Sequence, residues 1–138
     1  QLDFDLELAK KSSAENPVFY VQYVNARCNS ILEAAKNDEL DLKNINFDLL
    51  STKEERDLIK KLIAFSDTLL LCIKTLSPHH FTVYLIELAD LFHKFYETNR
   101  VLTDDKNLTK ARLALIKAVM IIIESGLNLI GVSAPKKM

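Results

Sequence analysis

Glycine, proline and tryptophan are scarce in this chain of 138 residues. It contains two glycines, three prolines and no tryptophan, so it offers few sites for tight turns and is expected to form long regular segments. Leucine, isoleucine, alanine and lysine are abundant instead, a composition that favours an all-α domain. Hydrophobic residues make up 49% of the sequence, which is enough for a single buried core.

Long hydrophobic runs are also lacking. The longest are residues 69–73 and 118–123, far short of the roughly 20 residues that a membrane-spanning helix needs. No charged segment followed by an apolar leader opens the chain, which argues against export. We therefore expect a cytoplasmic protein with no membrane partner.

Residue types that carry chemistry are few and scattered. Cys28 and Cys72 fall on the apolar stripes of different helices, so buried free thiols in a reducing compartment are favoured, with a disulfide as the alternative. There is no Cys-x-x-Cys spacing and the three histidines are dispersed, so no metal site is expected. No glycine-rich phosphate loop and no Ser-His-Asp or Cys-His arrangement is present. The sequence therefore predicts no catalytic residue.

The spacing of apolar residues predicts four long helices after residue 15, whereas residues 2–11 alternate at period two, a pattern that by itself would allow a strand. The first helix is expected to begin at Asn16, a good N-cap followed by Pro17, and to end near residue 37. The second begins at Ser51 or Thr52, each of which has a glutamate three residues later as in a capping box, and it stops before Pro78. The third covers about 78–99 and the fourth begins near residue 108. This pattern predicts an all-α bundle of four long helices.

Three further expectations concern the faces of these helices. His93 lies among polar residues of the third helix and is assigned to the solvated surface. The fourth helix is almost wholly apolar and is expected to be central. The apolar stripe assigned to the core from the second helix consists of Leu58, Ile59, Leu62, Ile63, Leu69, Leu70 and Ile73.

The net charge of −1 is distributed unevenly. Residues 1–99 hold 11 basic and 16 acidic side chains, a net charge of −5, whereas residues 100–138 hold 7 basic and 3 acidic ones, a net charge of +4. The basic excess predicts a patch for an acidic partner, and an ordinary solvated helix face is the alternative. Its expected members are Arg100, Lys106, Lys110, Arg112, Lys136 and Lys137.

Four segments resemble the C-terminal part of class I arginyl-tRNA synthetases. Residues 16–27 read NPVFYVQYVNAR, close to the family's NPVYYVQYAHAR, and residues 131–138 read GVSAPKKM, close to GxSAPxxM. Residues 91–102 match LFHKFYxxxRVL and residues 111–118 match ARLALxKA. The four matches occur in the family's order and extend over almost all of the chain.

The resemblance implies a helical, DALR-type anticodon-binding domain over residues 16–138, joined through the connector 1–15 to a catalytic domain outside this sequence. Such enzymes attach arginine to its tRNA with ATP and magnesium. Their HIGH-like and KMSK-like sequences, which serve adenylate formation, are absent here. The complete protein is thus expected to be an arginine–tRNA ligase, and this part of it to be inactive alone and to hold no cofactor. Its expected partners are arginine tRNA and its own catalytic domain, not DNA.

RNA outside duplexes is recognised by aromatic rings that stack on bases and by cations that hold phosphates. The resemblance places Tyr96 and Met138 near the anticodon loop, although a core-edge tyrosine is an equal alternative for Tyr96. This chain has Lys136 and Lys137 where the common family ending has Glu and Arg before the final Met, so one hydrogen bond from an acidic side chain does not carry over. The RNA-binding candidates are Tyr96, Arg100, Lys106, Lys110, Lys136, Lys137 and Met138.

A second stripe on the first helix is offset from its apolar stripe. It contains Tyr20, Tyr23 and Arg27, with Gln22 beside them. This face is expected to be partly exposed and to meet the catalytic domain or the tRNA. Alternatively, it belongs to a helical module that binds another protein and has no role with RNA.

Overall fold

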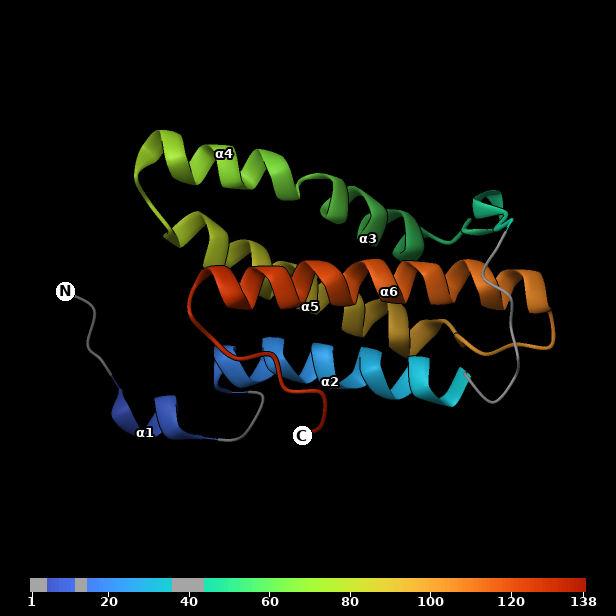
Figure 1. The fold of residues 1–138 in the computed structure, drawn as a ribbon, viewed down its shortest axis with the longest axis horizontal. Helices are drawn as coiled ribbons and strands as arrows, with labels where there is room; N and C mark the ends of the chain where they lie inside the picture. The colour runs from blue at the N-terminus through green and yellow to red at the C-terminus, as the bar shows by residue number, and fades with distance from the viewer. Residues whose placement is uncertain (1–4, 12–14, 36–43) are drawn as a thin grey trace.

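Every regular element of the described chain is helical. The computed structural model describes residues 5–11, 15–35 and 44–138, and the all-α prediction is confirmed over these ranges (Figure 1). Part of the predicted connector, at residues 1–4 and 12–14, lies outside the described residues. The elements are α1 (Leu6–Lys10), α2 (Pro17–Ala35), the 3₁₀ turn η2 (Phe47–Leu49), α3 (Lys53–Ile63), α4 (Phe65–Thr75), α5 (His79–Thr98) and α6 (Lys106–Leu129).

Two long helices, α5 and α6, lie at the centre of the bundle. In Figure 1 they run between α2 on one side and the α3–α4 pair on the other, and both contact α2 and α3. The N-terminal end of α2, the C-terminal end of α4 and the C-terminal end of α6 gather at one end of the molecule. None of the helices in the described ranges combines the length and apolar character needed to cross a membrane.

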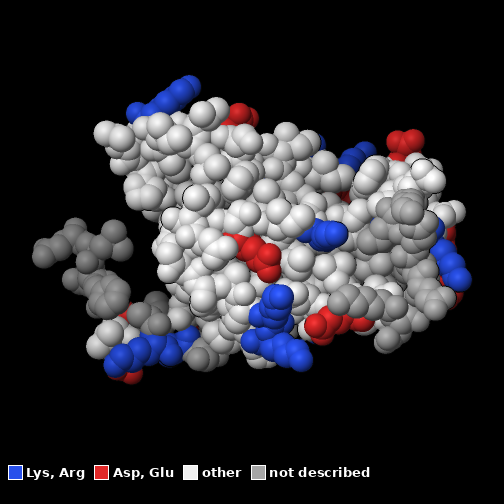
Figure 2. Space-filling view, viewed as in Figure 1, with Lys and Arg blue, Asp and Glu red and all other residues white. Residues whose placement is uncertain are grey.

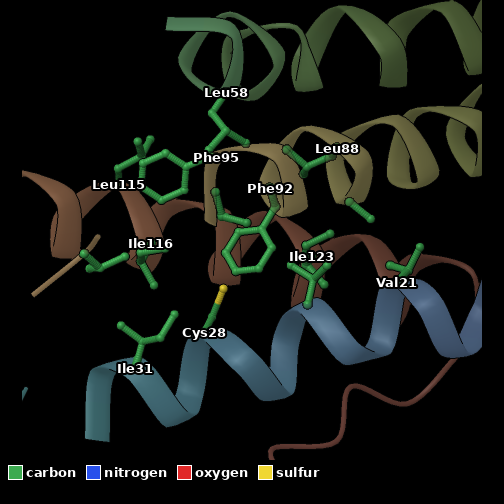
Figure 3. Close-up of a cluster of buried hydrophobic side chains, with 14 of the residues drawn as sticks. Val21, Cys28, Ile31, Leu58, Leu88, Phe92, Phe95, Leu115, Ile116 and Ile123 are labelled. Atoms are coloured by element: carbon green, nitrogen blue, oxygen red, sulfur yellow. The ribbon is translucent and has the colours of Figure 1, made fainter. Parts of the chain in front are cut away.

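Aromatic and aliphatic side chains of α5 and α6 form most of the core. Figure 3 shows Val21, Cys28 and Ile31 of α2 pointing toward these two helices. Gly126 permits a close approach of α6 to α5, because a Cβ there would lie 2.5 Å from Leu85 Cδ2. The largest fully buried apolar side chains are Tyr84, Phe92, Phe95, Leu58, Leu85, Leu88, Leu113, Ile116, Ile123, Leu127 and Val24.

Side-chain caps fix where the helices begin. The Asn16 side chain accepts from the Val18 N–H (3.0 Å) before Pro17, as expected from the sequence. Asp105 accepts from the N–H groups of Asn107 and Leu108, so α6 begins slightly earlier than predicted. For α3 the sequence offered two overlapping capping boxes, and the structure uses the one that begins at Thr52.

The single long helix predicted over residues 52–77 is wrong in one respect. It is divided at Ala64, whose ψ of −4° departs from the ideal helical value of about −42°. The division directs the ring of Phe65 toward Phe81 and Tyr84 of α5, at centroid distances of 5.8 and 5.9 Å. The four-helix description therefore holds only if α3 and α4 are counted together.

The sequence also assigned the whole apolar stripe of the second predicted helix to the core, and this assignment is wrong. Leu58 is buried, and Ile59, Leu62 and Leu69 are partly buried, but Ile63, Leu70 and Ile73 are 72%, 53% and 69% exposed. The stripe has helical spacing, yet α4 packs mainly against α5 and α3, and its side chains Leu70 and Ile73 stay exposed among the described residues.

A left-handed residue ends α6 and reverses the chain. Gly131 has a φ of 74°, which a residue without Cβ adopts at little cost. The Val132 N–H donates to the Leu127 carbonyl (2.9 Å) and the Gly131 N–H to Asn128 (3.1 Å), the Schellman pattern of helix termination. The C-terminal tail, residues 132–138, therefore returns along α2 (Figure 1).

Replacing Thr52 with Ala should lower the free energy of unfolding by about 1 kcal/mol, because the Thr52 hydroxyl accepts from the Glu55 N–H. Ser51→Ala is the matched control, since the exposed Ser51 side chain is not the cap of α3, and it should change stability by less than about 0.5 kcal/mol. Chemical denaturation of both variants measures the difference. Equal stability of the two would contradict the assigned cap.

Candidate functional site: a groove beside the C-terminal tail

Two amide side chains of α2 hold the C-terminal tail. The Gln22 Nε2 donates to the Ser133 carbonyl at 2.8 Å. The Asn25 Nδ2, on a fully buried side chain, donates to the carbonyls of Ala134 (3.2 Å) and Pro135 (3.1 Å). These contacts fix an otherwise irregular segment against a helix more than 100 residues earlier in the chain.

Arg27 joins α2 to the end of α5. Its Nη2 donates to the Tyr96 hydroxyl at 2.7 Å, and its guanidinium carbon lies 4.7 Å from the centre of the Tyr96 ring. Phe92 stacks against the same ring with a centroid distance of 6.0 Å and an interplanar angle of 10°. Tyr96 is thus a partly exposed ring whose position is fixed by one apolar and one cationic neighbour.

Two adjoining hollows flank Arg27, and we call them together the Arg27 groove. The larger, about 680 Å³, lies between α2 and residues 96–102, with Tyr96 and Arg100 among its lining residues. The smaller, about 300 Å³, is lined by Tyr23 of α2 and by Lys137 and Met138 of the tail. Arg27 and Ser30 line both hollows, so Arg27 borders the hollow beside the end of α5 and the hollow beside the tail.

The stripe of Tyr20, Tyr23 and Arg27 is partly exposed, as predicted, with Tyr23 at 40%. It also contacts the bundle, because the Tyr20 hydroxyl donates to Asp90 Oδ1 at 2.9 Å. Burial, this hydrogen bond and the charges of Asp90 and Glu97 raise the pKa of Tyr20 to about 12. Whether the stripe meets a catalytic domain or a tRNA stays a prediction.

His93 is not the solvated residue that the sequence predicted. Its ring lies 4.7 Å from the Tyr20 ring and 5.9 Å from the Tyr23 ring, measured between centroids. Its Nε2 atom is buried and, within the described part of the chain, has no hydrogen-bond partner. Burial lowers the pKa of His93, and the nearby charges of Asp90 and Glu97 only partly oppose this shift. The polar spacing on α5 was misleading because the tyrosines of α2 cover the ring.

The predicted basic residues do not form one patch. Arg112 is 8% exposed and pairs with Glu55, so its place in a surface patch was wrong. Lys106 and Lys110 lie in the first turns of α6, at the end of the bundle opposite the turn at Gly131. On the face drawn in Figure 2, basic side chains gather where the tail ends and acidic groups lie on either side. The exposed Arg100, Lys136 and Lys137 remain available near the Arg27 groove.

The remaining sequence expectations concern thiols and metals. Cys28 is a buried free thiol whose pKa burial raises, and Cys72 is a partly buried free thiol. Among the described residues, no group of three or more His, Cys, Asp or Glu side chains is placed to hold a metal ion. The described structure is thus an all-helical domain with a groove between α2, the end of α5 and the tail.

The family of this domain follows from comparison with known proteins. Residues 21–138 match the family described as the DALR anticodon binding domain. The chain belongs to that family, and the resemblance seen in the sequence is confirmed.

Full-length relatives are similar over the whole chain. The arginine–tRNA ligase of Dehalococcoides mccartyi (strain CBDB1) is 47% identical over 138 residues, which is 100% of this chain and 25% of the relative. That of Listeria monocytogenes serotype 4a (strain HCC23) is 47% identical over 139 residues, 99% of this chain and 25% of the relative. The Thermus thermophilus arginyl-tRNA synthetase structure has a TM-score of 0.83 at 29% identity, covering 100% of this chain and 24% of that one. The chain thus spans about a quarter of these relatives' length.

Asn25 was not identified from the sequence as a functional residue. It lies on α2 between Val24 and Ala26, and an asparagine between buried apolar residues is a signal that its amide has a specific partner. The partners are backbone carbonyls of the tail. The spacing of residues in the sequence does not predict that the tail lies against α2.

Replacing Asn25 with Ala should release the tail. Two hydrogen bonds of about 1 kcal/mol each are lost, so the tail should leave α2 roughly thirtyfold more often. Trypsin cleavage after Lys136 and Lys137 measures this release. Asn29→Ala, one turn later with its amide bonded to the Asn25 carbonyl, is the control and should cleave at the wild-type rate. Equal cleavage of both variants would contradict the amide clamp.

The lowered pKa of His93 predicts a loss of stability in acid. As the pH falls through about 6.5, the ordinary histidine value, the unfolded chain binds a proton that the folded chain resists, so the unfolded state is favoured. His93→Phe keeps a ring beside the tyrosines and should lose less stability between about pH 7.5 and 5.5 than the wild type. Denaturation midpoints of both proteins over this pH range measure the difference. If the midpoints of the wild type and of His93→Phe fall equally with pH, His93 does not cause the loss of stability.

Proposed function

We propose that this domain binds the anticodon stem-loop of arginine tRNA, and that residues 16–138 form the binding unit. The Arg27 groove carries the proposal, because it places a tyrosine ring, two arginines and the basic tail around one hollow surface. Membership of the DALR anticodon-binding family supports the same function.

The chemistry of the groove suits an unpaired RNA loop. Bases without pairing partners stack on aromatic rings or on arginine guanidinium planes, and cations hold the phosphates between them. The Arg27 guanidinium already covers part of the Tyr96 ring, so an entering base stacks on this pair and not on an uncovered ring. Arg100, Lys136 and Lys137 are exposed near this site and hold the phosphate backbone, with Lys106 and Lys110 reaching a more distant part of the stem.

We further propose that the complete protein is a cytoplasmic, ATP-dependent arginine–tRNA ligase. The relatives at 47% identity are arginine–tRNA ligases about four times as long as this chain. ATP and its magnesium belong to a catalytic domain outside this sequence, so this domain alone forms no aminoacyl-tRNA. Its part is to hold the anticodon so that the distant acceptor end lies in the active site, an orientation effect.

The connector 1–15 joins the two domains in this proposal. The partly exposed face of Tyr20, Gln22 and Tyr23 lies beside the Arg27 groove. It meets either the catalytic domain or the inner side of the tRNA.

Replacing Tyr96 in the complete protein tests the groove. Tyr96→Ala removes the ring and should weaken arginine tRNA binding by about 1–3 kcal/mol. Tyr96→Phe keeps the ring but removes the acceptor of the Arg27 hydrogen bond, so its loss should be smaller. Lys74→Ala, exposed on α4, is the control. Affinity measured by filter binding should rank wild type and Lys74→Ala first, then Tyr96→Phe, then Tyr96→Ala.

Deleting residues 136–138 should also weaken binding and reduce the dependence of affinity on salt, because phosphate contacts are lost. If both Tyr96→Ala and the deletion variant bound arginine tRNA with wild-type affinity, the groove would be ruled out as the tRNA-binding site. A protein ligand bound through this face with a flat salt response would favour the protein-interaction module instead.

A further inference from the structure

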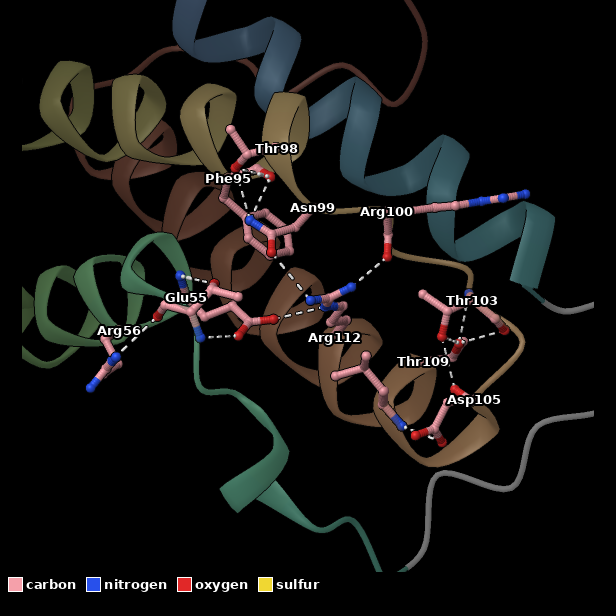
Figure 4. Close-up of polar contacts among 12 residues, drawn as sticks. Glu55, Arg56, Phe95, Thr98, Asn99, Arg100, Thr103, Asp105, Thr109 and Arg112 are labelled. Carbon is pink, nitrogen blue, oxygen red and sulfur yellow. Dashed lines mark hydrogen bonds and ion pairs between the residues drawn. The ribbon is translucent and has the colours of Figure 1, made fainter.

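A charged network lies under the loop that joins α5 to α6. The Arg112 Nε donates to Glu55 Oε1 at 2.7 Å, and Glu55 is fully buried. The other two guanidinium nitrogens point to the end of α5, where Nη1 donates to the Arg100 carbonyl (2.7 Å) and Nη2 to Asn99 Oδ1 (3.2 Å). Figure 4 shows the guanidinium reaching all three partners.

Glu55 is ionised in this network and neutralises Arg112. Burial alone would raise the pKa of Glu55, but hydrogen bonds from the Thr52 N–H and from Arg112, with the Arg112 charge, outweigh it and lower the pKa. The carboxylate also closes the capping box by accepting from the Thr52 N–H at 2.8 Å. The pair therefore places a fixed, neutralised guanidinium beneath the loop.

The loop is anchored at both ends, and Arg100 lies between the anchors. At its start, Asn99 donates its N–H to the Phe95 carbonyl (2.8 Å) and accepts from Arg112. At its far end, the Thr103 N–H donates to Thr109 Oγ1 (2.9 Å). In Figure 4 the Arg100 carbonyl points to Arg112, while the Arg100 side chain extends away from Arg112. That side chain is exposed and lines the Arg27 groove.

We propose that Arg112 is a positioning residue for RNA binding. By holding the Arg100 carbonyl and the Asn99 side chain, it fixes the backbone from which the Arg100 guanidinium reaches a phosphate in the Arg27 groove. Arg112 itself touches no RNA in this arrangement. The inference rests on the proposed function and adds to it a residue that acts from within the core.

The substitution Arg112→Lys separates the two roles of the side chain. A lysine ammonium keeps the charge that neutralises Glu55, but a single nitrogen on an unforked chain cannot also hold Asn99 and Arg100. In the complete protein, Arg112→Lys and Arg100→Ala should each weaken arginine tRNA binding about fivefold and lower the salt slope by about one. The double variant should be no weaker than Arg100→Ala alone, because both changes remove the same contact.

Hydrogen exchange gives a readout that does not depend on RNA. In Arg112→Lys, the amides of Asn99 and Thr103 should exchange faster while amides in the middle of α5 keep their wild-type rates. Ile123→Val, a fully buried position away from the loop, is the control. It should lower stability without changing the salt slope of tRNA binding or the exchange of these two amides.

Additive losses in the double variant, or wild-type binding by Arg112→Lys, would overturn the positioning role. Unchanged exchange at Asn99 and Thr103 would overturn it as well. If the wild-type protein does not bind arginine tRNA, the proposed function fails, and the exchange measurement still decides whether Arg112 fixes the loop.

Discussion

The buried pair between Glu55 and Arg112 sets three parts of the domain relative to one another. Glu55 belongs to the first turn of α3, Arg112 to α6, and the Arg112 guanidinium also reaches the residues that follow α5. Removing one partner of such a pair leaves an uncompensated charge in the core, at a cost of about 3–5 kcal/mol. The hydrogen bonds of Arg112 hold the Arg100 carbonyl and the Asn99 side chain at the end of α5, beside the groove that both residues line.

The fold was predictable where local chemistry decides it. The cap at Asn16, the capping box at Thr52 and the apolar spacing of the long helices are all visible in the sequence, and they lie where they were expected. The break at Ala64 was not predictable, because no glycine or proline marks it and Phe65 turns there toward rings on α5. The exposure of Leu70 shows the same limit. Spacing defines an apolar stripe but not the neighbour that covers it.

The candidate site was only partly predictable for a related reason. Arg27, Tyr96 and Met138 were each identified, but their meeting in one groove depends on a tail that reverses at Gly131 and is held by amide–carbonyl contacts. Arg112 was assigned to the surface because arginine is rarely buried without a partner. Its partner lies 57 residues earlier in the chain, and helical spacing predicts no contact between residues that far apart in sequence. Long-range contacts of this kind decide which residues share a site.

Crosslinking can decide whether the Arg27 groove, and not another face of the bundle, receives the anticodon loop. A photoreactive side chain introduced at Ser30, which is exposed and lies in both hollows, tests it in the complete protein bound to arginine tRNA. The same group at Leu70, exposed on α4, serves as the comparison. If the groove receives the loop, position 30 should crosslink to nucleotides of the anticodon loop and position 70 should not. Crosslinks from position 70 alone would contradict this placement of the loop.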